Sequence, residues 1–338
     1  MGRQPGAGDA GLFPETLPED RPPGAAEQDS ATHALAARLP AGLHLGTSSW
    51  NFPGWRGLVW DGDYSDKRLS REGISAYAKH PLFKAVSLDR AFYQPLTRAQ
   101  FAAYADAVPD GFKYVVKAPA QITDSLTRGS GGKARAPNPD FMRAELARSL
   151  LAEPAADGLG DCLGALVFQF SPLMAATRND IERTIADLHA MLGAARETVS
   201  DHVVLAVEVR DPEWLCQSLI DASKDAGATY CLGLHPRLPP VARQLPMLRA
   251  LWPGPFVCRW NLNMRHGIHG YEQAKASYAP FDTLVDPDDT TRDDIARVAA
   301  GTAGAGQPVF VTVNNKAEGS APRSVAALAA RIDALRGG

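Results

Sequence analysis

The amino-acid sequence predicts a single (β/α)8 TIM-type barrel with a disordered N-terminal extension. Eight short apolar runs occur along the chain, and most are followed by a segment with helical periodicity. With 338 residues, 45% of them hydrophobic, the chain can also bury a large core. Alternating strands and helices indicate a parallel sheet, and eight such units close into a barrel of roughly 250 residues. We therefore favour a barrel over an open doubly wound sheet.

The apolar runs predict the strands, because short runs bounded by turn residues are typical of buried strands. Their approximate positions are 42–48, 83–89, 112–118, 164–170, 203–210, 228–235, 256–261 and 308–314. Helices are predicted at 68–79, 97–107, 139–151, 178–194, 212–226, 291–301 and 321–335. The segment 236–252 is the exception, since its prolines allow little regular helix.

Residues 1–40 differ from the rest in composition. They are rich in Gly, Pro, Ala and acidic residues and show no hydrophobic periodicity, which predicts a flexible extension ahead of a barrel at 41–338. No signal-peptide pattern is present, and no apolar run approaches the roughly 20 residues that span a bilayer. We therefore expect a cytoplasmic protein without membrane contact.

Charge and cysteine content restrict the function classes. The net charge of −3 provides no global basic field for nucleic acid, which leaves only a local basic patch as a binding mode. The four cysteines have no paired spacing, which argues against a disulfide framework and a zinc site. We expect neither a metal nor another cofactor, and the sequence leaves the oligomeric state open.

Strand parity predicts which side chains line the barrel mouth. Side chains alternate between the two faces of a strand, and the inward residues at the C-terminal ends form the active site in such barrels. In each strand from the second onward, the last inward residue is polar or charged. The residues of this set that we expect in the site are Asp89, Lys117, Gln169, Glu208, Arg210, His235, Arg259 and Asn314.

Three of these residues are candidates for catalysis. Glu208, Lys117 and Asp89 are predicted as catalytic groups, with Arg210 and Arg259 as anchors for a substrate carboxylate or phosphate. Two alternatives stay open. The Glu208–Arg210 pair could be structural, and Lys117 could be a general base, a Schiff-base lysine or a cationic anchor.

The remaining candidates are predicted to contact the substrate. Gln169 and His235 are two of them. Asn314 and Asn315 end the last strand, where barrels often hold phosphate, although asparagine also forms turns. Another group is aromatic and forms either a stacking platform or a hydrophobic plug in the first loop. It comprises Trp50, Trp55 and Tyr93.

Several blocks of the chain together resemble the YecE-like family, domain of unknown function 72. The blocks lie at 46–50, 55–57, 91–93, 112–119, 167–172, 206–214 and 313–315, so the resemblance covers roughly 42–335. It implies a TIM-barrel fold and no established reaction. Ser87 stands where the family has glutamate, Asp89 where it has asparagine, and Asp124 where it often has histidine. If that glutamate is a catalytic acid or base in the family, either Asp89 substitutes for it or the site of this member is altered or inactive.

The favoured function is a metal-independent enzyme, a hydrolase or lyase using general acid–base chemistry. Its substrate would be polar and anionic, either phosphorylated or glycosidic. A rival interpretation is a barrel that binds nucleic acid or a nucleotide through basic residues, and a third is a catalytically degenerate scaffold. The basic residues in question are Arg210, Arg259, Lys117, Arg128 and Lys133.

Overall fold

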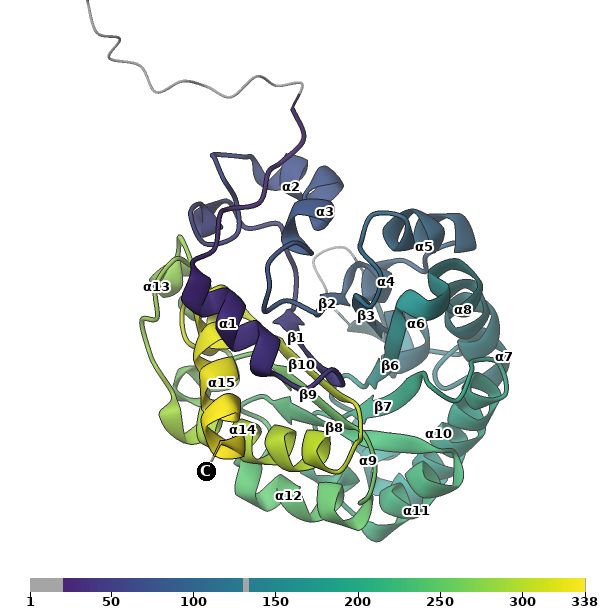
Figure 1. Cartoon of the computed structure of the whole chain (residues 1–338). Helices are drawn as coiled ribbons and strands as arrows, with labels where there is room; N and C mark the ends of the chain where they lie inside the picture. Colours follow the sequence, from purple (N-terminus) through teal and green to yellow (C-terminus); the bar gives the residue numbers. More distant parts are fainter. Residues whose placement is uncertain (1–20, 130–133, 338) are drawn as a thin grey trace, which may run out of the picture.

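A computed structural model, which describes residues 21–129 and 134–337, confirms the predicted barrel (Figure 1). Eight parallel strands close in the order β1-β10-β9-β8-β7-β6-β3-β2. Their bounds lie within two residues of the predicted runs. They are β1 (Leu43–Thr47), β2 (Ala85–Leu88), β3 (Lys113–Lys117), β6 (Leu163–Gln169), β7 (Val204–Glu208), β8 (Ala228–Leu234), β9 (Phe256–Trp260) and β10 (Val309–Val313).

Helices surround the barrel and cover the outward face of its strands (Figure 1). The longer ones are α1 (Ser30–Arg38), α2 (Asp66–Glu72), α5 (Arg98–Ala105), α8 (Glu153–Leu159), α10 (Ile181–Arg196), α11 (Gln217–Asp225), α12 (Val241–Ala250), α13 (Tyr271–Tyr278), α14 (Asp289–Gly304) and α15 (Ala321–Arg336). The shorter ones are α3 (Ile74–Tyr77), α4 (Arg90–Tyr93), α6 (Ala120–Thr123), α7 (Ala144–Ala147) and α9 (Ala175–Asn179). Across the described ranges, no helix is both long enough and apolar enough to cross a bilayer.

The barrel interior is filled by small and medium side chains, as strand parity predicts. The inner cluster comprises Ala85, Val115, Ala165, Val167, Val204, Ala206, Cys231, Val257 and Phe310. The alternate residues, such as Leu166 and Trp260, pack outward in the larger core beneath the helices. Polar residues of the same inward rows therefore emerge above this apolar plug, at the C-terminal mouth.

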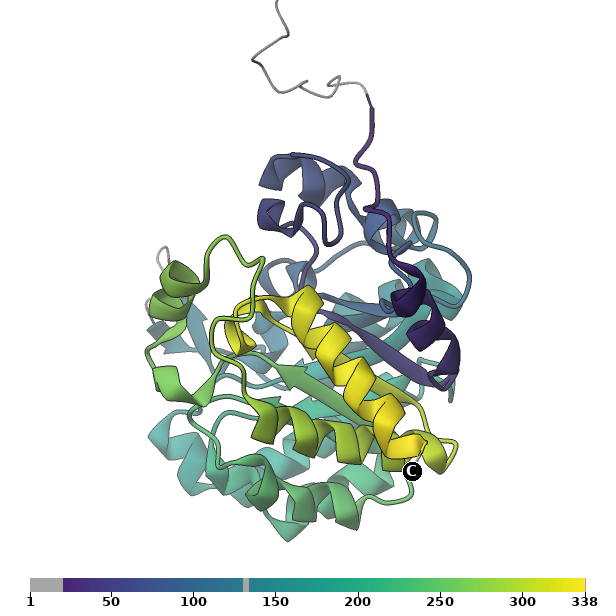
Figure 2. The ribbon, with the colours of Figure 1, turned by 60° about the vertical axis from the view of Figure 1, so that its left-hand side comes forward.

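The predicted N-terminal extension is wrong for residues 21–40. Asp29 caps α1 by accepting from the backbone N–H of Thr32 at 2.7 Å, and the Ala26 N–H donates to the Val59 carbonyl at 2.9 Å. Arg38 reaches Asp333 of α15 at 2.8 Å, and α1 lies beside that helix (Figure 2). The N-cap residue, the alanines and the leucine of α1 favour a helix. The prediction missed this local signal because it relied on the overall composition of residues 1–40. Residues 1–20 of the extension lie outside the described residues.

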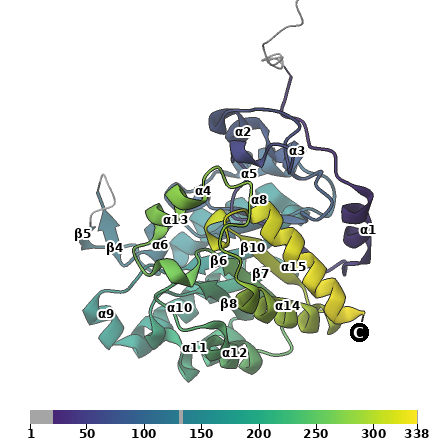
Figure 3. The same cartoon turned by 90° about the vertical axis from the view of Figure 1, so that its left-hand side faces the viewer.

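A β-hairpin interrupts the loop between β3 and α7. Its strands are β4 (Leu126–Arg128) and β5 (Ala134–Pro137), which pair antiparallel. The hairpin stands out on the same side as α4, α6 and α13, which follow the C-terminal ends of barrel strands (Figure 3). Residues 130–133, between the two strands in sequence, lie outside the described part of the chain.

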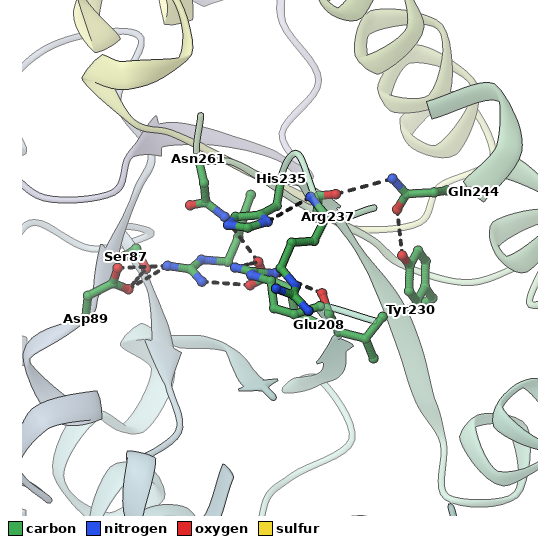
Figure 4. Close-up of polar contacts among 12 residues, drawn as sticks. Ser87, Asp89, Glu208, Tyr230, His235, Arg237, Gln244 and Asn261 are labelled. Carbon is green, nitrogen blue, oxygen red and sulfur yellow. Dashed lines mark hydrogen bonds and ion pairs between the residues drawn. The ribbon is translucent and has the colours of Figure 1, made fainter. Parts of the chain in front are cut away.

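The expectation of little regular helix in 236–252 is wrong, because α12 forms there. Pro240 directly precedes the helix, where a missing N–H costs nothing, and Pro246 removes one internal hydrogen bond. Gln244 compensates with its side chain, which accepts from the Tyr230 hydroxyl at 2.6 Å and donates to the Pro239 carbonyl at 2.7 Å (Figure 4). These bonds fasten α12 to β8.

Candidate active site

Four charged side chains from the ends of three strands converge at the mouth in one network (Figure 4). Glu208 ends β7, and its Oε1 lies 2.6 Å from Arg210 while its Oε2 lies 2.7 Å from Arg259 of β9. Arg259 extends across the mouth to Asp89, which follows β2, at 2.8 and 2.9 Å. Arg259 therefore bridges both carboxylates, and each acid is matched by an arginine.

Two neutral side chains complete the network. The Asn261 amide donates to Glu208 at 3.1 Å, and the Ser87 hydroxyl donates to Asp89 at 2.6 Å. Ser87, which stands at the position of the family glutamate, thus donates a hydrogen bond to the carboxylate two residues later. Asp89 keeps its side chain 33% exposed, whereas Arg259 is only 3% exposed. Asp89 is thus the acid of the network that solvent or a ligand can reach.

The fully buried Glu208 carboxylate is held ionised. Burial alone would raise its pKa, but Arg210, Arg259 and Lys117 outweigh burial and lower the pKa to about 2. Burial lowers the pKa of Arg259, but Asp89 and Glu208 outweigh burial and raise it. A carboxylate with both oxygens bound and such a pKa does not exchange protons near neutral pH, so its predicted role as general acid or base does not fit this geometry.

Gly233 of β8 provides the space in which the Glu208–Arg210 pair lies. A Cβ atom at this position would come within 3.2 Å of the Glu208 Cγ and 3.3 Å of Arg210 Nη1. Gly233 lies on the inward face of β8, two residues after Cys231 of the inner cluster. A glycine suits this position for a steric reason, because the ion pair occupies the volume that any other side chain would fill.

Lys117 ends β3 and contrasts with this network. Its residue is 9% exposed, and within the described ranges no carboxylate lies within 4.0 Å of its amine. The amine lies 3.4 Å from the centre of the Phe92 ring. Burial lowers the pKa of Lys117. Asp89 and Glu208 oppose this shift, whereas Arg259 and Arg210 add to it, and the pKa falls to about 7. Lys117 can therefore gain and lose a proton at neutral pH.

His235 and Gln169 lie at the same mouth. Burial and then Arg210 lower the pKa of His235 to about 4, so the ring is neutral at pH 7, and its Nδ1 accepts the Arg237 N–H at 3.2 Å (Figure 4). Gln169 is opposite Glu208 in the register of β6 and β7 and is 7% exposed. Within residues 21–129 and 134–337, no group of three or more His, Cys, Asp or Glu side chains is arranged to hold a metal ion.

Two of the predicted aromatic residues lie in the core. Trp50 is 6% exposed and donates to the Leu69 carbonyl at 3.0 Å, while Trp55 has no exposed surface. Trp55 donates to the Asn315 side-chain oxygen at 3.2 Å. The same oxygen accepts the Ala321 N–H at 2.8 Å, so Asn315 holds two loops together. Trp55 and Asn315 hold the first loop to the last, and we leave both out of the proposed catalytic site, whereas the bond of Trp50 stays within the connection between β1 and β2. Tyr93, by contrast, is 84% exposed.

Asn314 has mixed roles. Its oxygen accepts the Lys316 N–H at 3.0 Å, and its amide donates to the Ser48 hydroxyl at 2.7 Å. Sequence reasoning missed Lys316, a 4% exposed lysine 4.0 Å from the ring centre of Tyr271. Burial, and to a lesser degree Lys275, lowers its pKa to about 8 although Glu272 opposes this. Lys316 lies in a 3-10 turn beyond the last strand, where strand parity gives no signal.

The described residues of the predicted basic patch lie in two separate places, with Arg210, Arg259 and Lys117 at the barrel mouth and Arg128 in the hairpin. Arg210 and Arg259 are bound to acids within the barrel, and Arg128 of the hairpin pairs with Asp124 at 2.5 Å. Asp124, at the position of the family histidine, also accepts the Leu126 N–H at 3.1 Å. Lys133 lies outside the described residues.

The sequence profile of the family described as "Protein of unknown function DUF72" matches residues 44–337. The chain belongs to the DUF72 family. This confirms the resemblance predicted from the sequence blocks, since the YecE-like family is the same family. No curated protein matches the chain.

Solved structures of DUF72 family proteins are similar to this chain. Two crystal structures of such a protein from Enterococcus faecalis V583 have TM-scores of 0.57 and 0.52, with 18% and 16% identity. Each covers 88% of this chain, and the matches span 96% and 98% of the other chain. A DUF72 protein of Thermotoga maritima MSB8 has a TM-score of 0.49 and 16% identity, over 88% of this chain and 99% of that one. At these identities the two E. faecalis structures support the fold alone.

Proposed function

We propose that this DUF72 protein is an enzyme that uses Lys117 as general acid and base on a small anionic substrate at the barrel mouth. The observation that carries the proposal is the unmatched, buried amine of Lys117 with a pKa of about 7, beside a fixed network of charges. A group with a pKa near the working pH is the most effective in proton transfer. The proposed chemistry is that of a hydrolase or lyase without a metal or cofactor.

The charge balance of the mouth supports an anionic substrate. Asp89 and Glu208 are matched by Arg210 and Arg259, so protonated Lys117 adds one positive charge that no described acid neutralises at close range. Buried charges are normally paired, and an unpaired one is expected to find its partner in a ligand. Within this proposal the two arginines supply a preorganised positive field, and Glu208 is a positioning residue that holds them.

Asp89 is the second titratable group within reach of a ligand. It acts electrostatically on Lys117 and raises the pKa of that amine. In the proposed reaction, Asp89 stabilises the protonated form of Lys117 electrostatically and accepts a hydrogen bond from the substrate. Gln169 lies in the same inward layer and offers an amide to the substrate.

The experiment is a search for turnover in a library of phosphorylated, carboxylated and glycosidic metabolites, followed by mass spectrometry. We expect Lys117→Met to lower kcat/KM at least about 100-fold, the usual contribution of a general acid or base. The pH profile of the wild type should show a limb near pH 7. The control is Lys224→Met, which removes an exposed lysine of α11. Full activity in Lys117→Met would overturn the proposal.

Nucleotide or nucleic-acid binding is the second candidate, and the exposed ring of Tyr93 is the observation that favours it. An exposed aromatic ring beside cationic groups is a typical stacking surface for a base. Binding driven by phosphates would weaken steeply between about 50 and 200 mM salt. A salt-sensitive complex with an oligonucleotide, lost in Tyr93→Ala and without turnover, would favour this candidate over the enzyme.

A further inference from the structure

A cavity of about 300 Å³ lies beside the charged network, between the loop after β1 and the segment after β2. Its lining is rich in groups that donate or accept hydrogen bonds. They are the hydroxyls of Ser48, Ser49, Ser70 and Ser87, the amide of Asn51 and the carboxylate of Asp89. The volume is at the lower end of the range for small-molecule sites, which suits a ligand about the size of a monosaccharide.

Several of these groups keep capacity for a ligand. The Ser48 hydroxyl accepts from Asn314 at 2.7 Å, so its own proton is available to donate. Ser87 donates to Asp89 at 2.6 Å and retains its lone pairs. Asp89 accepts from Ser87 and Arg259, yet a partly exposed carboxylate has about four acceptor positions.

The cavity also has aromatic walls. Trp50 and Tyr104 line it and meet edge to face, with ring centres 5.9 Å apart, and the exposed Tyr93 lies at its rim. Ring faces pack against the apolar C–H surface of a ligand, while the hydroxyls and carboxylate bind its polar edge. A polyhydroxylated molecule presents both kinds of surface, whereas an alkyl chain would leave the serine hydroxyls without partners.

Asp89 belongs to both sites. Both oxygens of its carboxylate accept from Arg259 of the charged network, and the same residue lines the cavity. Leu88 of β2 is paired with Val116 of β3, so Asp89 and Lys117 follow one residue later on neighbouring strands. A ligand in the cavity would therefore extend past Asp89 toward Lys117.

We propose that this cavity binds the hydroxyl-rich part, a sugar or polyol, of the anionic substrate whose charged group faces Lys117. This inference rests on the proposed function for the anionic part, and on the cavity alone for the hydroxyl-rich part. It makes sugar phosphates and sugar acids the substrate class.

The test compares hydroxylated anions with alkyl anions of equal charge. Ribose 5-phosphate, glucose 6-phosphate, glycerol 3-phosphate and gluconate are titrated calorimetrically against pentyl phosphate, propyl phosphate and hexanoate. We expect at least one hydroxylated anion to bind at least 10-fold more tightly than its alkyl counterpart. Ser70→Phe, placed on an exposed residue of α2 at the cavity, should abolish this preference. The matched control Ser75→Phe, exposed on α3 and outside the cavity lining, should retain it.

The outcomes separate the two proposals. If no hydroxylated anion is preferred, or if Ser70→Phe keeps the preference, the sugar site is overturned. If anion affinity falls in Lys117→Met at the same time, the proposed function survives that failure. If Lys117→Met binds every anion as the wild type does while the hydroxyl preference persists and depends on Ser70, the cavity assignment stands and the proposed function fails.

Discussion

Two parts of the same barrel mouth treat buried charge in opposite ways. In the Asp89–Arg259–Glu208–Arg210 network, each acid lies within 2.9 Å of an arginine, and the pKa of Glu208 falls to about 2. At Lys117, an amine of similar burial faces the Phe92 ring without a carboxylate within 4.0 Å among the described residues, and its pKa falls to about 7. The network fixes its charges, whereas Lys117 changes its charge near neutral pH.

The difference assigns separate tasks to the two parts. Paired buried ions are costly to break but change little with pH, which suits the positioning of a substrate. An unpaired buried amine destabilises the fold when protonated, which is the usual sign of a group kept for chemistry rather than stability. The predictions below test this contrast.

The largest effect is expected from Glu208→Gln. The substitution leaves Arg210 and part of Arg259 buried without their carboxylate, so the free energy of unfolding should fall by about 3–5 kcal/mol. Urea denaturation at pH 7 measures it. The matched control is Glu213→Gln, because Glu213 is 48% exposed and lies 3.6 Å from Arg178. An exposed pair of this kind is worth less than about 1 kcal/mol, and equal losses in both variants would refute the network's role.

The same network predicts how the stability of the protein changes at acidic pH. The pKa of Glu208 in the fold, about 2, lies below its ordinary value of 4.5, so its ionised form stabilises the protein fully above pH 4.5. That stabilisation is lost as the pH falls from 4.5 toward 2. The stability difference between wild type and Glu208→Gln should therefore shrink over this range, and a constant difference would contradict the account.

Lys117→Met should raise the free energy of unfolding, whereas Glu208→Gln lowers it. The pKa of the folded-state amine, about 7, lies below the ordinary 10.5, so protonation opposes folding below pH 7. Methionine fills the same space without charge, and we expect a gain of about 2–4 kcal/mol at pH 6 that vanishes as the pH rises from 7 to 10.5. Thermal and urea unfolding across this range measure it. Lys224→Met, the exposed control, should change stability by less than about 0.5 kcal/mol.

A smaller effect is expected from Gly233→Ala. The added methyl group would press on the Glu208–Arg210 pair, and such overpacking costs about 1–3 kcal/mol. Gly193→Ala in α10 is the control, because nothing lies within 4 Å of its Cβ position and alanine favours the helix. Denaturation midpoints that rise in both variants would show that Gly233 does not make room for the pair.

The sequence predicted the barrel and its inward rows because both follow from local periodicity. The two-residue alternation in β7 was sufficient to place Glu208 and Arg210 on one face. It could not predict that Arg259 reaches Asp89, 170 positions away in sequence, because that contact depends on how the barrel closes. Nor could it show that no carboxylate of the described residues pairs with Lys117, since pairing is decided by neighbouring strands rather than by the strand itself.

Other misses have local causes. Pro246 was treated as a helix breaker, although tertiary bonds of Gln244 hold α12 in place. The substrate contacts predicted for Trp55 and Asn315 stay predictions, and the structure adds that the Trp55 ring N–H donates to the Asn315 side-chain oxygen across two loops. Position at a strand end predicts the neighbourhood of a side chain, but not whether the side chain faces the mouth or the loops around it.

The most direct test of the central claim is the protonation midpoint of Lys117 itself. The protein is labelled with 13C on the lysine ε-carbon, the Lys117 resonance is assigned by its absence in Lys117→Met, and its chemical shift is followed from pH 5 to 11. The account predicts a midpoint near pH 7. A midpoint near 10.5 would show that Lys117 stays charged at neutral pH, and it would contradict both the contrast with the ion-pair network and the role proposed for the lysine.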